Sequence, residues 1–262
     1  MFDLTGKVAL ITGSARGLGR DMAETLAKNG ASIIITSREE EKAVCAAEEI
    51  HQKYGVNTFG ARLDVTDIAD IERLYQLVSD KFQKVDILIN NAGGGSGASK
   101  GNLFERNVED IVSLINTNLV GVIFMCKIFG KGMIDNKGGK IINIGSIAGI
   151  VGRDRSIYHH AGMNEQPVDY AAAKGGIIAL TRDLAGLMSP YGVQVNCISP
   201  GGFRSANLSD CFNDEYSQKT MLGRMGTYNR DLNGAALFLS SQASDYITGH
   251  NLVVDGGFSV WK

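Results

Sequence analysis

Short apolar runs alternate along this chain with longer stretches that show helical periodicity. Seven of these runs have the length and the β-branched content of buried strands. They are 7–12 (KVALIT), 32–36 (SIIIT), 58–63 (TFGARL), 86–89 (DILI), 139–144 (GKIINI), 193–199 (VQVNCIS) and 252–255 (LVVD). Leu18, Met22 and Leu26 recur at helical spacing after the first run, and the stretch 68–82 repeats its apolar residues in the same way. The pattern predicts strands and helices in alternation.

Such alternation predicts an α/β domain built on a parallel sheet. Parallel strands need crossover connections, and helices in these connections cover both faces of the sheet. The continuous apolar run 32–36 fits burial on both faces. No linker divides the 262 residues, so we predict a single domain over 1–262 with a doubly wound parallel sheet of about seven strands. Ligands of such sheets bind at the carboxyl ends of the strands.

Composition excludes several classes of function. The net charge is −2 and the acidic and basic residues are interspersed, which predicts no nucleic-acid-binding and no membrane-binding surface. Cys45, Cys126, Cys197 and Cys211 are widely separated, and no histidine stands at a metal-ligand spacing from them. We interpret them as reduced thiols of a cytoplasmic protein without a metal site. The apolar run at the N-terminus is too short for a signal peptide or a membrane span.

A glycine-rich segment, TGSARGLG (12–19), follows the first predicted strand and opens the first predicted helix. Gly13 permits a tight turn, while Gly17 and Gly19 let the helix N-terminus approach a pyrophosphate, whose charge the helix dipole favours. A glycine-rich turn alone also fits a plain connection, but this position favours a dinucleotide. The predicted contacts in the segment are Gly13, Ser14, Arg16, Gly17, Leu18 and Gly19.

The end of the second predicted strand selects between two cofactors. An acidic residue there would bind the ribose hydroxyl of NAD, whereas a cation accommodates the 2′-phosphate of NADP. Ser37 and Arg38 occupy this end and Arg16 lies in the glycine-rich segment, which together favour NADP. NAD is the alternative if Glu39 or Glu40 binds the ribose. Ser37 and Glu40 also match a capping box, which would give these acids a structural role. An arginine can also stack on adenine without contacting a phosphate.

Eight motifs in a fixed order give the chain a resemblance to a known family. They are TGSARGLG (12–19), LDV (63–65), NNAG (90–93), NLVG (118–121), IGSIAG (144–149), YAAAK (170–174), ISPGG (198–202) and ITGHNLVVDGG (247–257). With these motifs, over nearly its whole length, the chain resembles the single-domain short-chain dehydrogenase/reductases. Gluconate 5-dehydrogenase-like and 3-oxoacyl-carrier-protein reductase-like members look most similar. The family has a Rossmann-like sheet, usually of seven strands, that binds NAD(H) or NADP(H).

The resemblance implies cofactor contacts at three further strand ends. The implied residues are Asp64 and Val65 at adenine, Asn91, Ala92 and Gly93 along the ribose and nicotinamide, and Pro200, Gly201, Phe203 and Ser205 around the nicotinamide. Ser205 keeps the hydroxyl of the threonine that relatives often have at its position. We expect Asn90 to brace the sheet instead.

Two asparagines in LINTNLVG compete for one place in the site. On an α-helix Asn116 and Asn118 point about 200° apart, so only one of them can face the site. Asn118 matches the family position whose asparagine holds a water in a proton relay. We therefore expect Asn116 to lie on another face.

Two tyrosines compete for the role of general acid/base. A catalytic tyrosine needs a cation that lowers its pKa, which is ordinarily about 10. Tyr170 has Lys174 four residues later on the same helical face, whereas Tyr158 has Gly162 there. The spacing assigns proton transfer to Tyr170, and the family motif Y-x-x-x-K agrees. Lys174 would also bind the nicotinamide ribose, and Ser146 would bind the substrate oxygen.

The distance in sequence between Ser146 and Tyr170 departs from the family. Relatives commonly place the tyrosine about a dozen residues after the serine, near Tyr158, but Tyr170 follows Ser146 by 24 residues. We predict an inserted loop within 151–169 at the mouth of the active site. Its charged residues are either solvated or contact a polar or anionic substrate, and the candidates for such contact are Arg153, Arg155, His159 and His160.

Together these features predict an NADP(H)-dependent oxidoreductase that interconverts a secondary alcohol and a ketone on a small polar substrate, such as a sugar acid or a polyol. A 3-oxoacyl-carrier-protein reductase is the alternative, although the chain has no basic run to dock an acidic carrier protein. A non-catalytic NADPH-binding sensor is disfavoured because Ser146, Tyr170, Lys174 and Asn118 are all present. The resemblance also implies a homodimer or a homotetramer.

Overall fold

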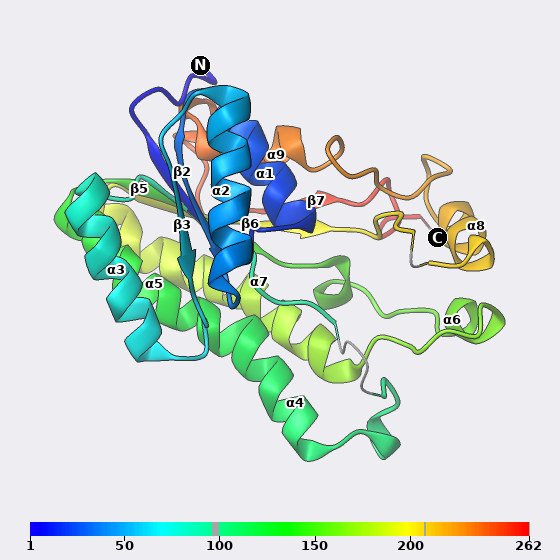
Figure 1. Cartoon of the computed structure of the whole chain (residues 1–262). Helices are drawn as coiled ribbons and strands as arrows, with labels where there is room; N and C mark the ends of the chain where they lie inside the picture. The colour runs from blue at the N-terminus through cyan, green and yellow to red at the C-terminus, as the bar shows by residue number, and fades with distance from the viewer. Residues whose placement is uncertain (96–99, 207, 262) are drawn as a thin grey trace.

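The seven predicted strands all form, and they pair in parallel within one sheet (Figure 1). The computed structural model describes residues 1–95, 100–206 and 208–261. The strands are β1 (Val8–Ile11), β2 (Ser32–Ser37), β3 (Thr58–Arg62), β4 (Ile87–Asn90), β5 (Gly139–Ile144), β6 (Val193–Pro200) and β7 (Asn251–Val254). Their order across the sheet is β3-β2-β1-β4-β5-β6-β7. The predicted fold class is therefore confirmed.

Helices join successive strands, as the periodicity predicted. The α-helices are α1 (Gly17–Lys28), α2 (Glu40–Tyr54), α3 (Ile68–Phe82), α4 (Val108–Ile115), α5 (Gly121–Asp135), α6 (Ser156–His160), α7 (Val168–Met188), α8 (Asp210–Gln218) and α9 (Asn233–Ser240). The 3-10 turns are η1 (Leu103–Glu105), η3 (Ile147–Gly149), η4 (Ser189–Tyr191) and η5 (Gln242–Ser244), and η2 (Asn116–Val120) is a π-helical turn between α4 and α5.

Each face of the sheet buries its own hydrophobic core. Leu10 of β1 points into a core formed with α3, α5 and α7, whereas its neighbours Ala9 and Ile11 point into a second core formed with α1, α2 and α9. Successive side chains of a strand point to opposite faces, so this division follows directly from the apolar run. Figure 1 shows the two layers of helices on either side of the strands.

The strand order reverses between β1 and β4, which are neighbours in the middle of the sheet. Connections from the two strands leave in opposite directions at such a point and open a crevice at the carboxyl ends. Gly13 follows β1 and Asn91 follows β4, so both lie at this crevice. The fold thus brings two motifs together that are almost 80 residues apart in sequence.

The inserted segment 151–169 is more ordered than the predicted loop. Residues 156–160 form the short helix α6, and the last residues of the segment belong to α7. Tyr158 is buried in a third apolar cluster, together with Phe212 and Tyr216 of α8. The loop prediction was wrong because these aromatic partners lie more than 50 residues further along the chain and leave no local pattern.

A continuous helical run, Val108–Asp135, contains α4, η2 and α5. By length and composition alone it is apolar enough to cross a membrane. Met125 and Phe129 of this run are buried in the core against the sheet, while Val112 and Ile123 are exposed. The run is therefore a flanking helix of the sheet with an apolar outer side.

Candidate active site

The glycine-rich segment forms the turn between β1 and α1 that the sequence predicted. Gly13 and Gly17 have φ of +62° and +61°, a region that favours glycine. A Cβ on Gly19 would lie 2.5 Å from Nδ2 of Asn91, so a larger residue does not fit there. The N-cap residue Arg16 makes no side-chain cap, and the first turn of α1 carries no acid. The first N–H groups of α1 can therefore serve an anionic ligand.

Two predicted cofactor contacts in this turn have side chains that pack within the protein. The Ser14 hydroxyl is fully buried, donates to the Ile11 carbonyl at 2.6 Å and accepts from the Thr36 amide at 3.3 Å. Leu18 packs against the core beneath α1. The Ser14 and Leu18 side chains therefore hold the turn in place. Only the backbone atoms of these two residues are left for the predicted contact with the cofactor.

Asn91 joins the end of β4 to the glycine turn. Its Nδ2 donates to the carbonyls of Thr12 at 2.9 Å and Gly13 at 3.1 Å, and the backbone amides of Asn91 and Ala92 both donate to Thr12 Oγ1 at 2.9 Å. Asn90 points the other way, into the core, where its Nδ2 donates to Asn143 Oδ1 at 2.9 Å. The expectation that Asn90 braces the sheet is confirmed.

Asn116 and Asn118 both line the cavity at the carboxyl ends of the strands, but they differ in burial. Asn118 is buried, its Oδ1 accepts from the Gly94 amide at 3.0 Å and its Nδ2 donates to the Gly94 carbonyl at 3.1 Å, whereas Asn116 is exposed. The expectation that only one of them can face the site was wrong, because both residues lie in the π-helical turn η2 and not in a regular α-helix. Such turns occur often at functional sites, where they redirect one side chain. The role of Asn118 stays a prediction.

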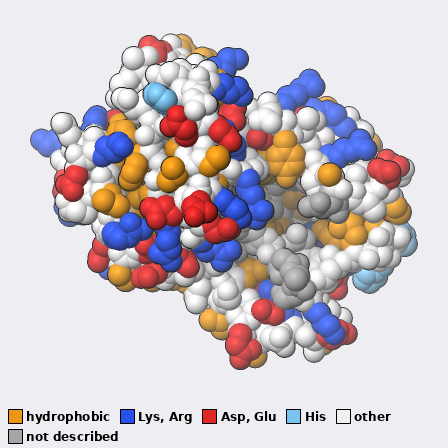
Figure 2. Space-filling model, viewed as in Figure 1, with side chains coloured by type: hydrophobic (Ala, Val, Ile, Leu, Met, Phe, Trp, Pro, Cys, Tyr) orange, Lys and Arg blue, Asp and Glu red, His pale blue; other side chains and the backbone are white. Residues whose placement is uncertain are grey.

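A cavity of about 1140 Å³ extends along the carboxyl ends of β1 to β4. Its walls include Gly13, Arg16, Ser37, Arg38, Asp64, Val65, Asn91, Ala92, Gly93 and Asn118, all of them predicted contacts. Residues of α4 line its other side. Figure 2 shows acidic and basic side chains intermixed over the face seen in Figure 1. Other predicted site residues do not line this cavity: Ser146, Tyr170, Lys174, Pro200, Gly201, Phe203 and Ser205.

Cations gather at the end of the cavity beside β2. Arg16, Arg38 and Lys42 all line it together with Glu39, which accepts a hydrogen bond from Lys42 at 2.6 Å. Glu49 lines it too and is paired with Arg20. The hydrogen bond from Lys42, reinforced by the charges of Arg16 and Arg38, holds the pKa of Glu39 below its usual value. Sequence reasoning missed Lys42, although its place one helical turn after Arg38 was a usable signal.

The predicted capping box between Ser37 and Glu40 does not form. Ser37 is the last residue of β2, and its hydroxyl accepts from the Glu39 amide at 3.2 Å. The N-cap of α2 is Glu39, which makes no side-chain cap. The helix starts later than the motif implied, so the Ser37 hydroxyl stays beside the cavity.

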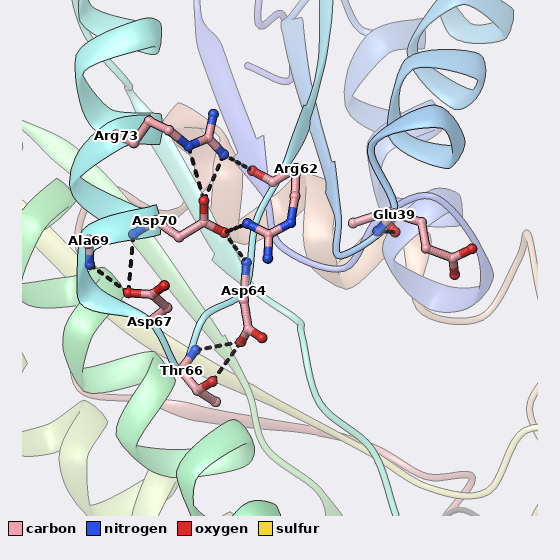
Figure 3. A network of polar contacts seen from close by, with 9 residues as sticks. Glu39, Arg62, Asp64, Thr66, Asp67, Ala69, Asp70 and Arg73 are labelled. Atoms are coloured by element: carbon pink, nitrogen blue, oxygen red, sulfur yellow. Dashed lines mark hydrogen bonds and ion pairs between the residues drawn. The ribbon is translucent and has the colours of Figure 1, made fainter.

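The end of β3 is fixed by a polar network (Figure 3). The Asp70 carboxylate accepts from the Asp64 amide at 2.7 Å and pairs with Arg62 and Arg73, each at 2.8 Å. Burial acts to raise the pKa of Asp70, but these hydrogen bonds and charges lower it below its usual value. Asp64 Oδ1 in turn accepts from the amide and hydroxyl of Thr66. The network holds Asp64 and Val65 at the cavity wall.

Ser146, Tyr170 and Lys174 converge at the end of β5. Ser146 caps η3, where its hydroxyl accepts from the Ala148 amide at 3.1 Å. Tyr170 and Lys174 lie one turn apart near the start of α7, and the Lys174 ammonium is 5.7 Å from the centre of the Tyr170 ring. Lys174 Nζ also donates to the Ile144 carbonyl at 2.7 Å. The predicted trio therefore meets in space.

The expected lowering of the Tyr170 pKa by Lys174 is not what this structure shows. Burial raises the pKa of Tyr170, and the opposing influences are a hydrogen bond with Ser146 and the charge of Arg153. Burial also lowers the pKa of Lys174 to about 8. Sequence reasoning considered the spacing of the two groups but not their desolvation, which works against charge on both.

A buried ion pair that sequence reasoning missed anchors the start of the catalytic helix. Arg106, next to η1, pairs with Asp169 at 3.0 Å, and both side chains are almost fully buried. Asp169 directly precedes Tyr170. No local signal could reveal this pair because its partners are 63 residues apart.

The residues that follow β6 offer mainly backbone atoms to a ligand. A Cβ on Gly201 would lie 2.8 Å from the Asp255 Cα, so glycine is required there. The Phe203 ring packs edge-on against Tyr228 and belongs to the core, so its predicted contact with the nicotinamide is limited to its backbone. Pro200 ends β6, and Ser205 lies in the following segment, half-buried.

The segment predicted to be an insertion packs next to Ile147, the residue after Ser146, and we call residues 151–169 the roof segment. Its Tyr158 ring lies 5.1 Å from Phe212 of α8, and α6 and α8 lie side by side in Figure 1. His160 Nδ1 contacts the Glu215 carboxylate at 3.1 Å. At its other end, Asn164 Oδ1 accepts from the Gly101 amide at 2.9 Å. The roof segment thus bridges α8 and the chain after β4.

Among the described residues, no group of three or more His, Cys, Asp or Glu side chains is arranged to hold a metal ion. All four cysteines are free. The paired histidines of α6 are both exposed.

Comparison with known proteins shows the family of the chain. The family described as "Enoyl-(Acyl carrier protein) reductase" matches residues 13–259. A 3-oxoacyl-(acyl-carrier-protein) reductase FabG of Vibrio harveyi is 36% identical over 260 residues, which cover 97% of this chain and 98% of the relative. A 2-dehydro-3-deoxy-D-gluconate 5-dehydrogenase of Formosa agariphila is 35% identical over 263 residues, covering 98% of this chain and 94% of the relative.

Solved structures give the same result. A gluconate 5-dehydrogenase from Burkholderia cenocepacia, in complex with NADP and tartrate, superimposes with a TM-score of 0.90 at 34% identity and covers 100% of this chain and 98% of its own. A gluconate dehydrogenase structure from Agrobacterium tumefaciens has a TM-score of 0.87 at 34% identity, with coverage of 100% and 99%. The chain therefore belongs to the short-chain dehydrogenase/reductases and is an oxidoreductase acting on CH–OH or keto groups.

Proposed function

We propose that the protein interconverts a secondary alcohol and a ketone on a small polar substrate with NADP(H). The observation that carries the proposal is the convergence of Ser146, Tyr170 and Lys174 beside a cofactor-sized cavity. The nicotinamide, when bound, supplies or accepts the hydride. The protein contributes position, a polarised substrate oxygen and a proton.

The cavity fits a dinucleotide phosphorylated on its adenosine ribose. Uncapped N–H groups at the start of α1 suit a pyrophosphate, and Gly17 has open space where a Cβ would stand. Arg16, Arg38 and Lys42 outweigh the carboxylate of Glu39, and Glu49 is already paired with Arg20, so this end of the cavity carries excess positive charge. A ribose hydroxyl does not need such a charge, whereas a 2′-phosphate does. The complex of the Burkholderia cenocepacia relative with NADP supports the same choice.

Each residue of the trio has a distinct task in the proposed reaction. Tyr170 donates its phenolic proton to the ketone oxygen in reduction and recovers it in oxidation. Ser146 donates a hydrogen bond to the same oxygen and stabilises the charge that develops there. The Lys174 ammonium stabilises the phenolate and binds the nicotinamide ribose, and Asn118 holds a water of the proton relay.

The 3-oxoacyl-carrier-protein reductases supply a second candidate function. The FabG enzymes of several bacteria are 35–37% identical to this chain over nearly its whole length. Both candidates use the same trio, so only the group that enters beside it distinguishes them.

A kinetic screen tests both candidates. Purified protein is assayed with NADP and NADPH, and with NAD and NADH, against sugar acids, polyols and 3-oxoacyl thioesters. We expect turnover of a sugar acid or a polyol with the phosphorylated cofactor. Turnover of thioesters alone would establish the second candidate, and preference for NADH would refute the cofactor choice.

We also propose that the chain forms a homodimer or homotetramer in the cytoplasm. Val112 and Leu187 are exposed apolar residues on α4 and α7, and the free thiols fit a reducing compartment. Light scattering on the eluting protein tests the assembly, and a monomer would contradict it.

A further inference from the structure

Arg153 of the roof segment has no acidic partner among the described residues. The segment holds three acidic residues, and each is paired elsewhere: Asp154 with Lys219, Glu165 with Arg155, and Asp169 with Arg106. The one hydrogen bond of the Arg153 guanidinium to a described residue runs from Nη2 to the Pro167 carbonyl at 2.9 Å. Most of its N–H donors are therefore available to a ligand.

The Arg153 side chain lies beside the catalytic phenol. Pro167, whose carbonyl it binds, is the N-cap of α7, and Tyr170 is in the first turn of that helix. The positive charge of Arg153 acts on both Tyr170 and Tyr158, and burial lowers the pKa of its own guanidinium. A half-buried cation without a carboxylate partner has lost hydration, so an arriving anion stabilises it.

The other cationic candidates of the roof segment have structural tasks or lie outside. Arg155 pairs with Glu165, and His160 contacts Glu215 of α8. His159 is exposed. The structure thus reduces the four candidates from the sequence to one.

We propose that Arg153 binds a carboxylate of the substrate, so that the natural substrates are a hydroxy acid and the corresponding keto acid. The planar guanidinium presents paired N–H donors that match the two oxygens of a carboxylate. One unpaired cation balances the single charge of a carboxylate, whereas a phosphate dianion would need a second. The inference rests on the proposed function, since it specifies the substrate class of the same site.

The test separates binding from turnover. Protein loaded with NADPH is titrated calorimetrically with D-gluconate and tartrate, which cannot be reduced at their hydroxyl carbons, and with glucitol and threitol as uncharged counterparts. We expect Arg153→Ala to weaken binding of at least one acid by about tenfold to a hundredfold and to leave the polyols unchanged. Arg153→Lys should keep part of the acid affinity. The matched control is Lys219→Met, which removes the partner of Asp154 and should preserve the preference for acids.

Each outcome decides the question. Equal losses for acids and polyols in Arg153→Ala would make the role structural, and acid binding that is absent or independent of Arg153 would overturn the inference. Acids that bind through Arg153, with no turnover of any acid or polyol, would leave the carboxylate site standing and overturn the proposed function. Turnover of polyols but of no acid would overturn the substrate class inferred here and leave the proposed function standing. Turnover of acids and polyols with unchanged KM in Arg153→Ala would overturn this inference alone.

Discussion

The cofactor side of this site and its roof segment are formed by different kinds of structural element. The cofactor side consists of strand ends, glycine turns and backbone amides, and it is an open cavity. The roof segment is held by side chains from segments far apart in sequence, such as Tyr158 and Phe212, which share an apolar cluster with Ile147 beside Ser146. Tyr216 of α8 extends the aromatic packing to Phe258, with ring centres 4.7 Å apart.

The difference separates two demands on the enzyme. The cofactor side is part of the sheet, so it changes only if the fold changes. The roof segment lies outside the sheet, so its residues can vary without disturbing the strands. We infer that reaction type is set by the first region and substrate choice by the second.

The largest effect should come from the one phenol that belongs to both regions. Tyr170→Phe removes the transferable proton, so we expect kcat/KM to fall by about 10²–10⁴-fold while NADPH still binds. Tyr158→Phe is the matched control, because it removes the neighbouring phenol and should leave kcat/KM nearly unchanged. Steady-state kinetics and NADPH fluorescence measure both. A greater loss of activity in Tyr158→Phe than in Tyr170→Phe would reverse the assignment.

A smaller effect, confined to the cofactor side, should follow from Arg38→Ala. Loss of a charge-assisted bond to the 2′-phosphate should weaken NADPH binding by about tenfold to a hundredfold and leave NADH binding unchanged. Arg62→Ala is the comparison variant: it disturbs the Asp70 network that holds Asp64 at the cavity wall, so it should change NADPH and NADH binding alike. Equal changes in NADPH and NADH affinity in Arg38→Ala would show that Arg38 does not contact the phosphate.

The smallest effect should come from the roof contact between His160 and Glu215. Both side chains are partly exposed, so Glu215→Gln should cost about 1 kcal/mol or less of stability. We expect KM for the substrate to rise a few fold and NADPH affinity to stay constant. Parallel titrations with substrate and NADPH measure the two quantities. A matching change in NADPH affinity would show that the roof segment and the cofactor side are coupled, which would contradict their separate roles.

Local sequence patterns predicted the cofactor side well. The apolar runs and the glycine-rich segment are contiguous, so their strand, turn and helix follow from short-range geometry. The preference for Tyr170 over Tyr158 needed only a lysine four residues away. The capping box at Ser37 was wrong by a residue or two, as helix ends often are, because strand and helix compete for the same backbone there.

The sequence by itself determined the α/β sheet, the dinucleotide turn and the residues of the catalytic trio, since each depends on neighbours along the chain. Only the tertiary structure decided that segment 151–169 packs against α8, that Arg106 anchors Asp169, and that Arg153, unlike Arg155, has no acidic partner among the described residues. Pairing and burial depend on residues brought together from distant segments. Desolvation, which raises the pKa of Tyr170 and lowers that of Lys174, likewise exists only once the chain has folded around them.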